Sequence, residues 1–178
     1  MFPDGRIAPS DSVFALLPSV RSFLEIRDGV YLVGMHTGGL ALYDSHTHKL
    51  IKYNTREEGS RKLYNDQVSN IVKDREGRIW IGTFGGGFCR FDEEKGIMEW
   101  LTAVEGLSDD NINSIIPGDD GKLWISTGNG ISAYDPESRQ FTNYMGRSEI
   151  PVNEFSMKGG IKSVSYTHLR AHETLMNL

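Results

Sequence analysis

Amide and carboxylate side chains recur at three places in the sequence, each time just before a run of apolar residues. The three groups are Asn65-Asp66-Gln67, Asp109-Asp110-Asn111 and Asn153-Glu154. Such side chains can exchange hydrogen bonds with the hydroxyls of a sugar, and aromatic rings such as Tyr64 and Phe84 can stack on a sugar face. These residues are therefore the predicted ligand-binding site, and the alternative is that their side chains only cap turns.

Histidines and aspartates occur in few patterns that suit a metal ion. His168 and His172 would share one face of a helix, but no third ligand lies near them in the sequence. His46-Thr47-His48 is expected to be a solvated turn. Asp119 and Asp120 lie outside any twelve-residue EF-hand pattern, so calcium is not indicated. We expect no metal site and no cofactor.

Two further features could suggest catalysis or phosphate binding. Gly85-Gly86-Gly87 precedes a predicted strand, whereas phosphate loops precede a helix, so a tight turn is expected. Cys89 alternates with neighbours on that strand and has no His-Asp set tied to it, so a buried structural thiol is expected. The chain is predicted to be non-catalytic.

The composition narrows the class of protein. The chain has 178 residues with 19 Lys+Arg and 24 Asp+Glu, a net charge of −5, which argues against a nucleic-acid binder. One cysteine excludes an internal disulfide framework. No apolar run approaches the roughly 20 residues of a membrane-spanning helix. The start of the chain is a poor secretory signal, so either the protein is cytosolic or its natural start lies elsewhere. The 20 glycines indicate many turns.

A repeat organises the chain. The segment around Trp80 recurs around Trp124, 44 residues later, and in both copies a Gly-rich turn follows and then a second apolar segment that ends in an aromatic residue and Asp. A weaker copy has Leu32 in place of the Trp and ends at Asp44, 48 residues before Asp92. A fixed period of 40–50 residues is typical of β-propeller blades.

Each repeat is predicted to form four short strands, which in the middle copy are 67–72, 78–83, 88–91 and 97–101. Ile79 and Ile81 would face one way and Trp80 the other, so both faces of this sheet are apolar. Sheets that are apolar on both faces pack between neighbouring sheets, which favours a propeller over the alternative, a β-sandwich.

The predicted fold class is all-β, a partial β-propeller of about three four-stranded blades plus the first strand of a fourth. The expected divisions are an N-terminal partial blade or linker at 1–19, blade 1 at 20–62, blade 2 at 63–106, blade 3 at 107–149, the start of blade 4 at 150–163 and a tail at 164–178.

The pairing of NDQVSNIVKDREGRIWIGTFGGGFCRFD with DDNINSIIPGDDGKLWISTGNGISAYDP resembles the two-component regulator propeller repeat. The resemblance covers about residues 20–162, and Ile150-Pro151-Val152-Asn153-Glu154-Phe155 is similar to a segment of a late blade in that family. Such repeats build the periplasmic sensor region of hybrid two-component histidine kinases of Bacteroidetes. There, two propellers precede an immunoglobulin-like domain, a membrane helix and a kinase.

The resemblance implies a periplasmic, ligand-sensing segment of a transmembrane sensor histidine kinase, and many such sensors respond to oligosaccharides. The implied partners are an oligosaccharide, the neighbouring blades and a sensor homodimer, with membrane contact only through other parts of the parent protein. Residues 164–178 resemble the translation of a transposase-based sequencing adaptor, so the chain is expected to be a truncated gene fragment.

Two other functions remain open from the sequence. A streptogramin-lyase-like propeller enzyme would need a His/Glu constellation on one face, and His36 is the histidine near a plausible face loop. A propeller that serves only as a protein-interaction scaffold is the third possibility.

Overall fold

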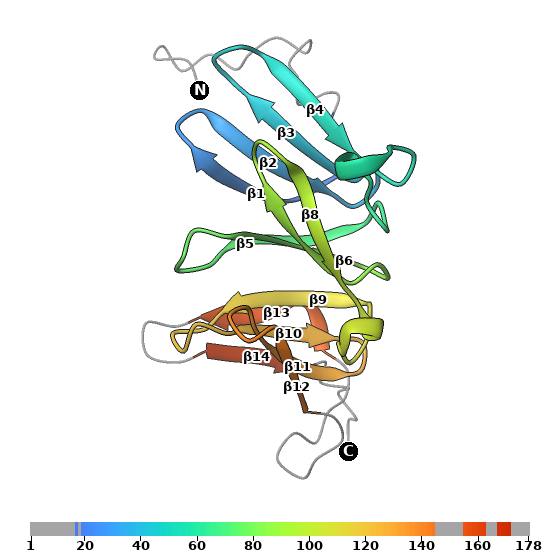
Figure 1. Cartoon of the computed structure of the whole chain (residues 1–178), viewed down its shortest axis with the longest axis vertical. Helices are drawn as coiled ribbons and strands as arrows, with labels where there is room; N and C mark the ends of the chain where they lie inside the picture. The colour runs from blue at the N-terminus through green and yellow to red at the C-terminus, as the bar shows by residue number, and fades with distance from the viewer. Residues whose placement is uncertain (1–16, 18, 145–154, 163–166, 172–178) are drawn as a thin grey trace, which may run out of the picture.

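The structure is a computed structural model that describes residues 17, 19–144, 155–162 and 167–171, and strands dominate them (Figure 1). The first four-stranded antiparallel sheet contains β1 (Val20–Arg27), β2 (Val30–Met35), β3 (Leu40–Asp44) and β4 (Lys49–Tyr53). The second contains β5 (Val68–Lys73), β6 (Ile79–Thr83), β7 (Phe88–Asp92) and β8 (Gly96–Leu101). The third contains β9 (Ile112–Pro117), β10 (Leu123–Thr127), β11 (Gly130–Asp135) and β12 (Gln140–Tyr144). One-turn 3₁₀ segments, η2 (Gly59–Arg61) and η3 (Ala103–Glu105), follow the first and second sheets.

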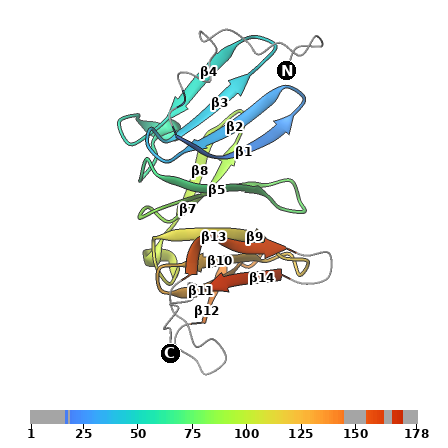
Figure 2. The same cartoon turned by 180° about the vertical axis from the view of Figure 1, so that it is seen from behind.

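The three sheets are arranged as successive blades. Within each sheet the strands lie in sequence order, and the first strands β1, β5 and β9 pack side by side from one sheet to the next. Figures 1 and 2 show the sheets stacked along the molecule, each turned relative to the last. The all-β, partial propeller predicted from the repeat is confirmed.

A fourth unit follows the third blade. It consists of β13 (Phe155–Lys162) and β14 (Thr167–Ala171), which pair antiparallel, and β13 lies against β9. Strand β13 falls in the segment expected to start a fourth blade, and β14 falls in the predicted tail.

The middle sheet carries apolar side chains on both faces. Ile79 and Ile81 are buried against the first blade, in a cluster with Leu32 and Leu40. Trp80, which is 1% exposed, points the other way and joins the cluster shared with the third blade. The prediction that this sheet packs between two others is therefore confirmed.

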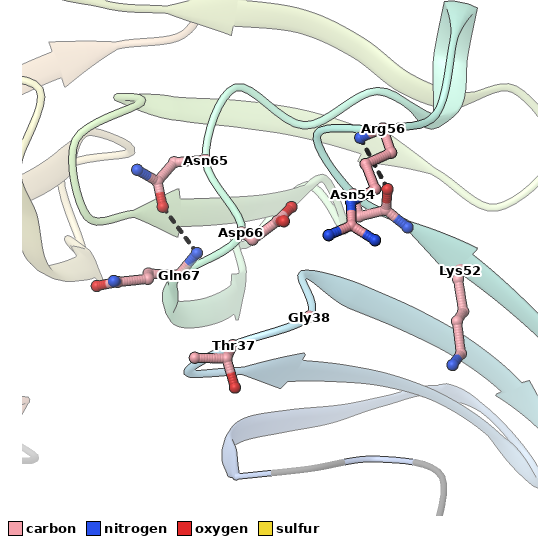
Figure 3. A pocket seen from close by; sticks show the side chains of 8 residues that line it. All are labelled: Thr37, Gly38, Lys52, Asn54, Arg56, Asn65, Asp66 and Gln67. Atoms are coloured by element: carbon pink, nitrogen blue, oxygen red, sulfur yellow. Dashed lines mark hydrogen bonds between the residues drawn. The ribbon is translucent and has the colours of Figure 1, made fainter.

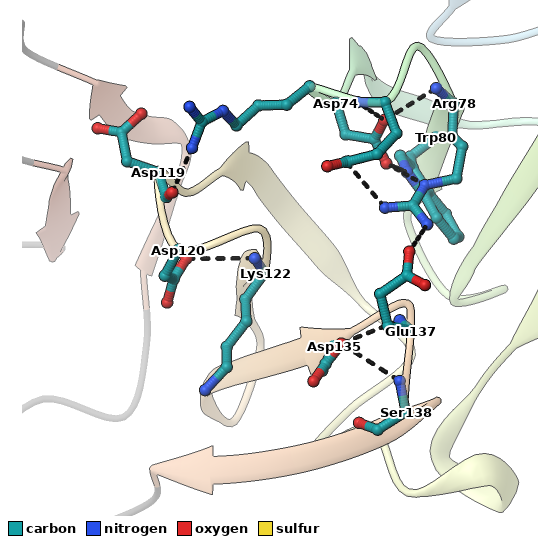
Figure 4. Close-up of polar contacts among 11 residues, drawn as sticks. Asp74, Arg78, Trp80, Asp119, Asp120, Lys122, Asp135, Glu137 and Ser138 are labelled. Atoms are coloured by element: carbon teal, nitrogen blue, oxygen red, sulfur yellow. Dashed lines mark hydrogen bonds and ion pairs between the residues drawn. The ribbon is translucent and has the colours of Figure 1, made fainter.

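The turn between the third and fourth strands of each blade is held by an aspartate. The carboxylates of Asp44, Asp92 and Asp135 each accept hydrogen bonds from the backbone N–H groups two and three residues later, at 2.8–3.3 Å. Because these bonds favour the ionised form, the pKa of each carboxyl is lowered. Figure 4 shows the turn at Asp135. The aspartate that follows the aromatic residue in each repeat thus stabilises the turn between the third and fourth strands.

Polar contacts join the second and third blades near this end of the strands (Figure 4). The nearly buried carboxylate of Asp74 accepts from Arg78 Nε at 2.6 Å and from Trp80 Nε1 at 2.9 Å. Arg78 also donates to Glu137 of the third blade at 2.7 Å, and Arg75 donates to a backbone carbonyl of the same blade. Together these bonds fix the middle blade against its neighbour.

Among the described residues, no helix has the length and apolar character that crossing a bilayer requires.

Candidate functional site

The predicted site residues that the structure describes lie at the opposite end of the blades from the aspartate turns. We call the loop just before the first strand of a blade its leading loop, which is 64–67 in blade 2 and 108–111 in blade 3. Val68, which follows the leading loop of blade 2, pairs with Thr83, which begins the glycine turn 83–87 between β6 and β7. Leading loops and glycine turns therefore lie at the same end of the strands, as expected for one face of a propeller.

The first residue of each polar triplet shapes its own loop. Asn65 Oδ1 accepts from the backbone N–H of Gln67 at 2.8 Å, and Asp109 Oδ1 accepts from the N–H of Asn111 at 2.6 Å. These are Asx turns, in which a short polar side chain replaces a backbone acceptor. One oxygen of each side chain is therefore occupied, and the amide nitrogen of Asn65 remains as a donor.

The aspartates at the centre of the triplets connect successive blades through their backbone. The carbonyl of Asp66 accepts from the N–H of Gly39 in blade 1 at 2.9 Å. The carbonyl of Asp110 accepts from Gly85 at 3.0 Å and from Gly87 at 2.9 Å in blade 2. The glycine turns of blades 1 and 2 are thus closed by the leading loop of the following blade.

The carboxylates of the same aspartates hold the chain that crosses between blades. Asp66 accepts from the backbone N–H of Thr55 at 2.7 Å and from its hydroxyl at 3.0 Å. Asp110 accepts from the N–H of Ala103 at 2.7 Å. Asp66 thus holds the crossing chain through both of its carboxylate oxygens, and Asp110 does so through Oδ1.

A pocket of about 500 Å³ opens where the glycine turn of blade 1 meets the leading loop of blade 2 (Figure 3). Its lining combines three predicted residues with five others, and comprises Thr37, Gly38, Lys52, Asn54, Arg56, Asn65, Asp66 and Gln67. Figure 3 shows Thr37 and Gln67 on one side of the pocket and Lys52 and Arg56 on the other. Every side chain of this lining is polar or charged, which suits a hydroxyl-rich ligand.

The remaining predicted residues lie outside this pocket. Tyr64 is 55% exposed and stacks on Trp100, with ring centroids 4.3 Å apart and an interplanar angle of 8°. Both rings line a separate hollow of about 440 Å³ beside η2. Tyr64 could therefore offer a stacking surface, but to a different hollow from the one that Asn65 lines.

Phe84 and the triplet of blade 3 form a second group. Phe84 is 36% exposed and forms a β-bridge with Asn111. Gly85 lies between the side chains of Asn65 and Asn111, because a Cβ built on it would fall 3.3 Å from Asn65 Nδ2 and 3.6 Å from Asn111 Oδ1. The structure thus brings residues of two triplets to one point. Asn153 and Glu154 lie outside the described residues.

Five lining residues escaped the sequence analysis, namely Thr37, Gly38, Lys52, Asn54 and Arg56. The 48-residue offset between the first two repeats was the signal that could have found two of them, since it aligns Thr37 and Gly38 with the glycine turn at Gly85 and Gly86. The others come from the end of β4 and the loop after it, which the repeat did not mark as functional.

The residues considered for other chemistry lie in ordinary surroundings. Gly87 leads directly into β7, so its turn joins two strands and does not open a helix. Cys89 is buried, and burial raises the pKa of its thiol, which disfavours the reactive thiolate. His36 Nδ1 is buried without a hydrogen-bond partner in the described structure. Within the same residues, no group of three His, Cys, Asp or Glu side chains could hold a metal ion.

The structure thus shows consecutive propeller blades with a polar pocket between the first two. Residues 65–85 and 106–129 match the family model of the two component regulator propeller. These two segments, which contain Trp80 and Trp124, therefore match the propeller repeat that the sequence resemblance predicted. No curated protein matches the chain significantly.

Solved structures support the same relationship. One, described as the extracellular domain of a hybrid two component system from B. thetaiotaomicron, is 29% identical with a TM-score of 0.60, over 76% of this chain and 18% of that one. Another, described as the extracellular domain of a one component system from the same organism, is 25% identical with a TM-score of 0.59, over 74% of this chain and 19% of that one. The chain thus spans less than a fifth of each relative.

A third similar structure is virginiamycin B lyase from Staphylococcus aureus, 19% identical with a TM-score of 0.53, over 75% of this chain and 42% of that one. At this identity the similarity shows a shared propeller fold and nothing about activity.

Proposed function

We propose that the chain is a non-catalytic, ligand-sensing propeller segment of a transmembrane two-component sensor histidine kinase, located in the periplasm and responding to an oligosaccharide. The polar pocket between blades 1 and 2 is the observation that carries the proposal. The similarity to extracellular domains of two-component systems supports the cellular context.

The pocket suits a saccharide because it offers donors that the protein itself leaves free. In the described structure the Asn65 amide nitrogen and the Gln67 side chain have no hydrogen-bond partner, although Asn65 Oδ1 and the Gln67 backbone N–H are bonded to each other. The Asx turn therefore holds the Asn65 side chain in place and leaves its amide nitrogen unbonded. A prearranged donor costs little conformational entropy on binding.

Signal transfer in the parent protein would follow as a population shift. A ligand that bridges the glycine turn of blade 1 and the leading loop of blade 2 favours one packing of these blades over others. That preference would bias the packing of the sensor against its homodimer partner.

Titration calorimetry of the whole chain with a panel of oligosaccharides tests the proposal. Gln67→Ala removes a half-buried side chain that forms no hydrogen bond in the described structure, and the loss of one or two neutral hydrogen bonds to the ligand should weaken binding about 3- to 30-fold. Asn65→Ser should also weaken binding, since serine keeps a turn-capping oxygen but loses the amide N–H groups.

Gln140→Ala is the matched control, because Gln140 is exposed at the start of β12, near the aspartate turns. It should leave both affinity and unfolding unchanged. An absence of binding to every oligosaccharide would refute the proposed function. Binding that Gln67→Ala does not change would refute this pocket as the site.

A further inference from the structure

Two cationic side chains of the pocket, Lys52 and Arg56, form no ion pair in the described part of the chain, and both are exposed. By contrast, Arg27, Arg61 and Arg78 each pair with a carboxylate at 2.6–3.1 Å. The charges of Lys52 and Arg56 are therefore available to a ligand.

The one carboxylate in the lining, that of Asp66, balances only one of these two positive charges. Asp66 already accepts two hydrogen bonds from Thr55, at 2.7 and 3.0 Å. The lining carries two positive charges and one negative charge, a net +1, on a chain whose net charge is −5. The pocket is thus locally positive against the overall charge of the protein.

The repeat shows that the fold does not require these cations. At the 48-residue offset, Lys52 and Arg56 correspond to Trp100 and Val104 at the next blade crossing. The register is secure, because Asn54 Oδ1 accepts from Arg56 N at 2.8 Å just as the hydroxyl of its equivalent, Thr102, accepts from Val104 N at 3.2 Å. The end of the fourth strand and the turn that follows it thus carry two cations at one crossing and apolar residues at the other, although the rest of the two crossings differs.

From these observations we propose that the pocket selects an acidic saccharide, one that carries a carboxylate or a sulfate group. The acidic group would lie between Lys52 and Arg56, and the amides of Asn65 and Gln67 would contact sugar hydroxyls. A guanidinium matches the paired oxygens of carboxylate and sulfate, and hydrogen bonds between opposite charges are about twice as strong as neutral ones. This inference rests on the proposed function, because it specifies the ligand of the same pocket.

The test uses calorimetry of the whole chain with two matched pairs of probes. The first pair is tetragalacturonic acid and its fully methyl-esterified form, and the second is a sulfated galactan tetrasaccharide and its desulfated form. At least one acidic probe should bind at least about tenfold more tightly than its neutral match, a difference of about 1.4 kcal/mol. That preference should shrink as salt is added.

The variants Lys52→Gln and Arg56→Gln should each weaken acidic-probe binding about 5- to 10-fold and leave neutral-probe binding nearly unchanged. Lys49→Gln is the matched control, since it makes the same charge change on the same strand but outside the pocket, and it should change neither.

The outcomes separate the two proposals. Preference for one acidic probe over the other identifies the acidic group and supports the inference. If neutral and acidic probes bind equally and Lys52→Gln has no effect, the charge inference is overturned while the proposed function stands. If no saccharide binds at all, both are overturned.

Discussion

Replacing Trp80 tests whether the middle blade is packed between two others. Its ring is 1% exposed, with centroids 5.8 Å from Phe88 and 5.9 Å from Tyr134 of the next blade. Truncating so buried an aromatic ring costs about 3–5 kcal/mol in the free energy of unfolding. Trp80→Ala also removes the Nε1 donor to the carboxylate of Asp74, so the upper part of this range is expected.

Trp124→Ala is an internal control, because Trp124 occupies the same position in the next repeat but is only half-buried in the described structure. We expect it to cost about 1–2 kcal/mol, since part of the ring contacts water before truncation. Trp80→Phe separates the two contributions to the larger loss. It keeps most of the apolar ring and should cost about 1.5–3 kcal/mol, mainly through the lost hydrogen bond to a charged acceptor.

Urea unfolding followed by far-ultraviolet circular dichroism provides the measurement, because tryptophan fluorescence would change with the substitution itself. The slope against urea should stay constant across the variants if only stability changes. Equal losses for Trp80→Ala and Trp124→Ala would refute the argument that Trp80 lies between two packed sheets. If Trp80→Ala does not fold, Trp80→Phe provides the comparison with Trp124→Ala.

Two further predictions concern the turns at the two ends of the blades. Gly87→Ala should cost well over 1 kcal/mol in the free energy of unfolding by urea, since φ is +72° and a Cβ would lie too close to the carbonyl oxygen of Leu101. Gly77→Ala, with φ of +81° but open space around it, should cost only about 1 kcal/mol. Equal costs for the two variants would contradict the close approach at Gly87. The carboxyls of Asp44, Asp92 and Asp135 have lowered pKa values in the folded protein, so their ionised forms stabilise the fold at a pH above the unfolded pKa of about 3.9. This stability should be lost as the pH falls through the folded pKa values. Replacing the three aspartates with asparagine should flatten acid unfolding curves measured below pH 5, and an unchanged curve would contradict it.

The sequence predicted the strands closely because its repeat is also a physical pattern. The strand predicted at 78–83 is found at Ile79–Thr83, and the apolar residues on both of its faces predicted two packed neighbours. That inference needed only the alternation of side chains along a strand. The structure places the polar triplets of blades 2 and 3 at one end of the blades, since loops before equivalent strands must lie together.

The pocket itself could not be predicted from the sequence. Lys52 belongs to β4 and Asn65 to the loop before β5, and their approach depends on how the chain crosses between blades over η2. The role of Asp66 was equally hidden, because its acceptor capacity is used by Thr55, a residue that no repeat landmark marks. The sequence could identify polar residues as candidates, but only the folded loops show which of their atoms have no hydrogen-bond partner within the protein.

The bond from a glycine turn to the leading loop of the following blade affects which pieces of a propeller gene can be exchanged by recombination. Gly39 donates to Asp66 and Gly87 donates to Asp110, so blades 1 and 2 are each completed by residues encoded after their own four strands. An exchange that cuts between β4 and the next leading loop gives one blade a foreign partner for its glycine turn. A module that extends from β1 through Gln67 keeps its native partner, and such staggered modules should be the units that are duplicated or grafted without loss of fit.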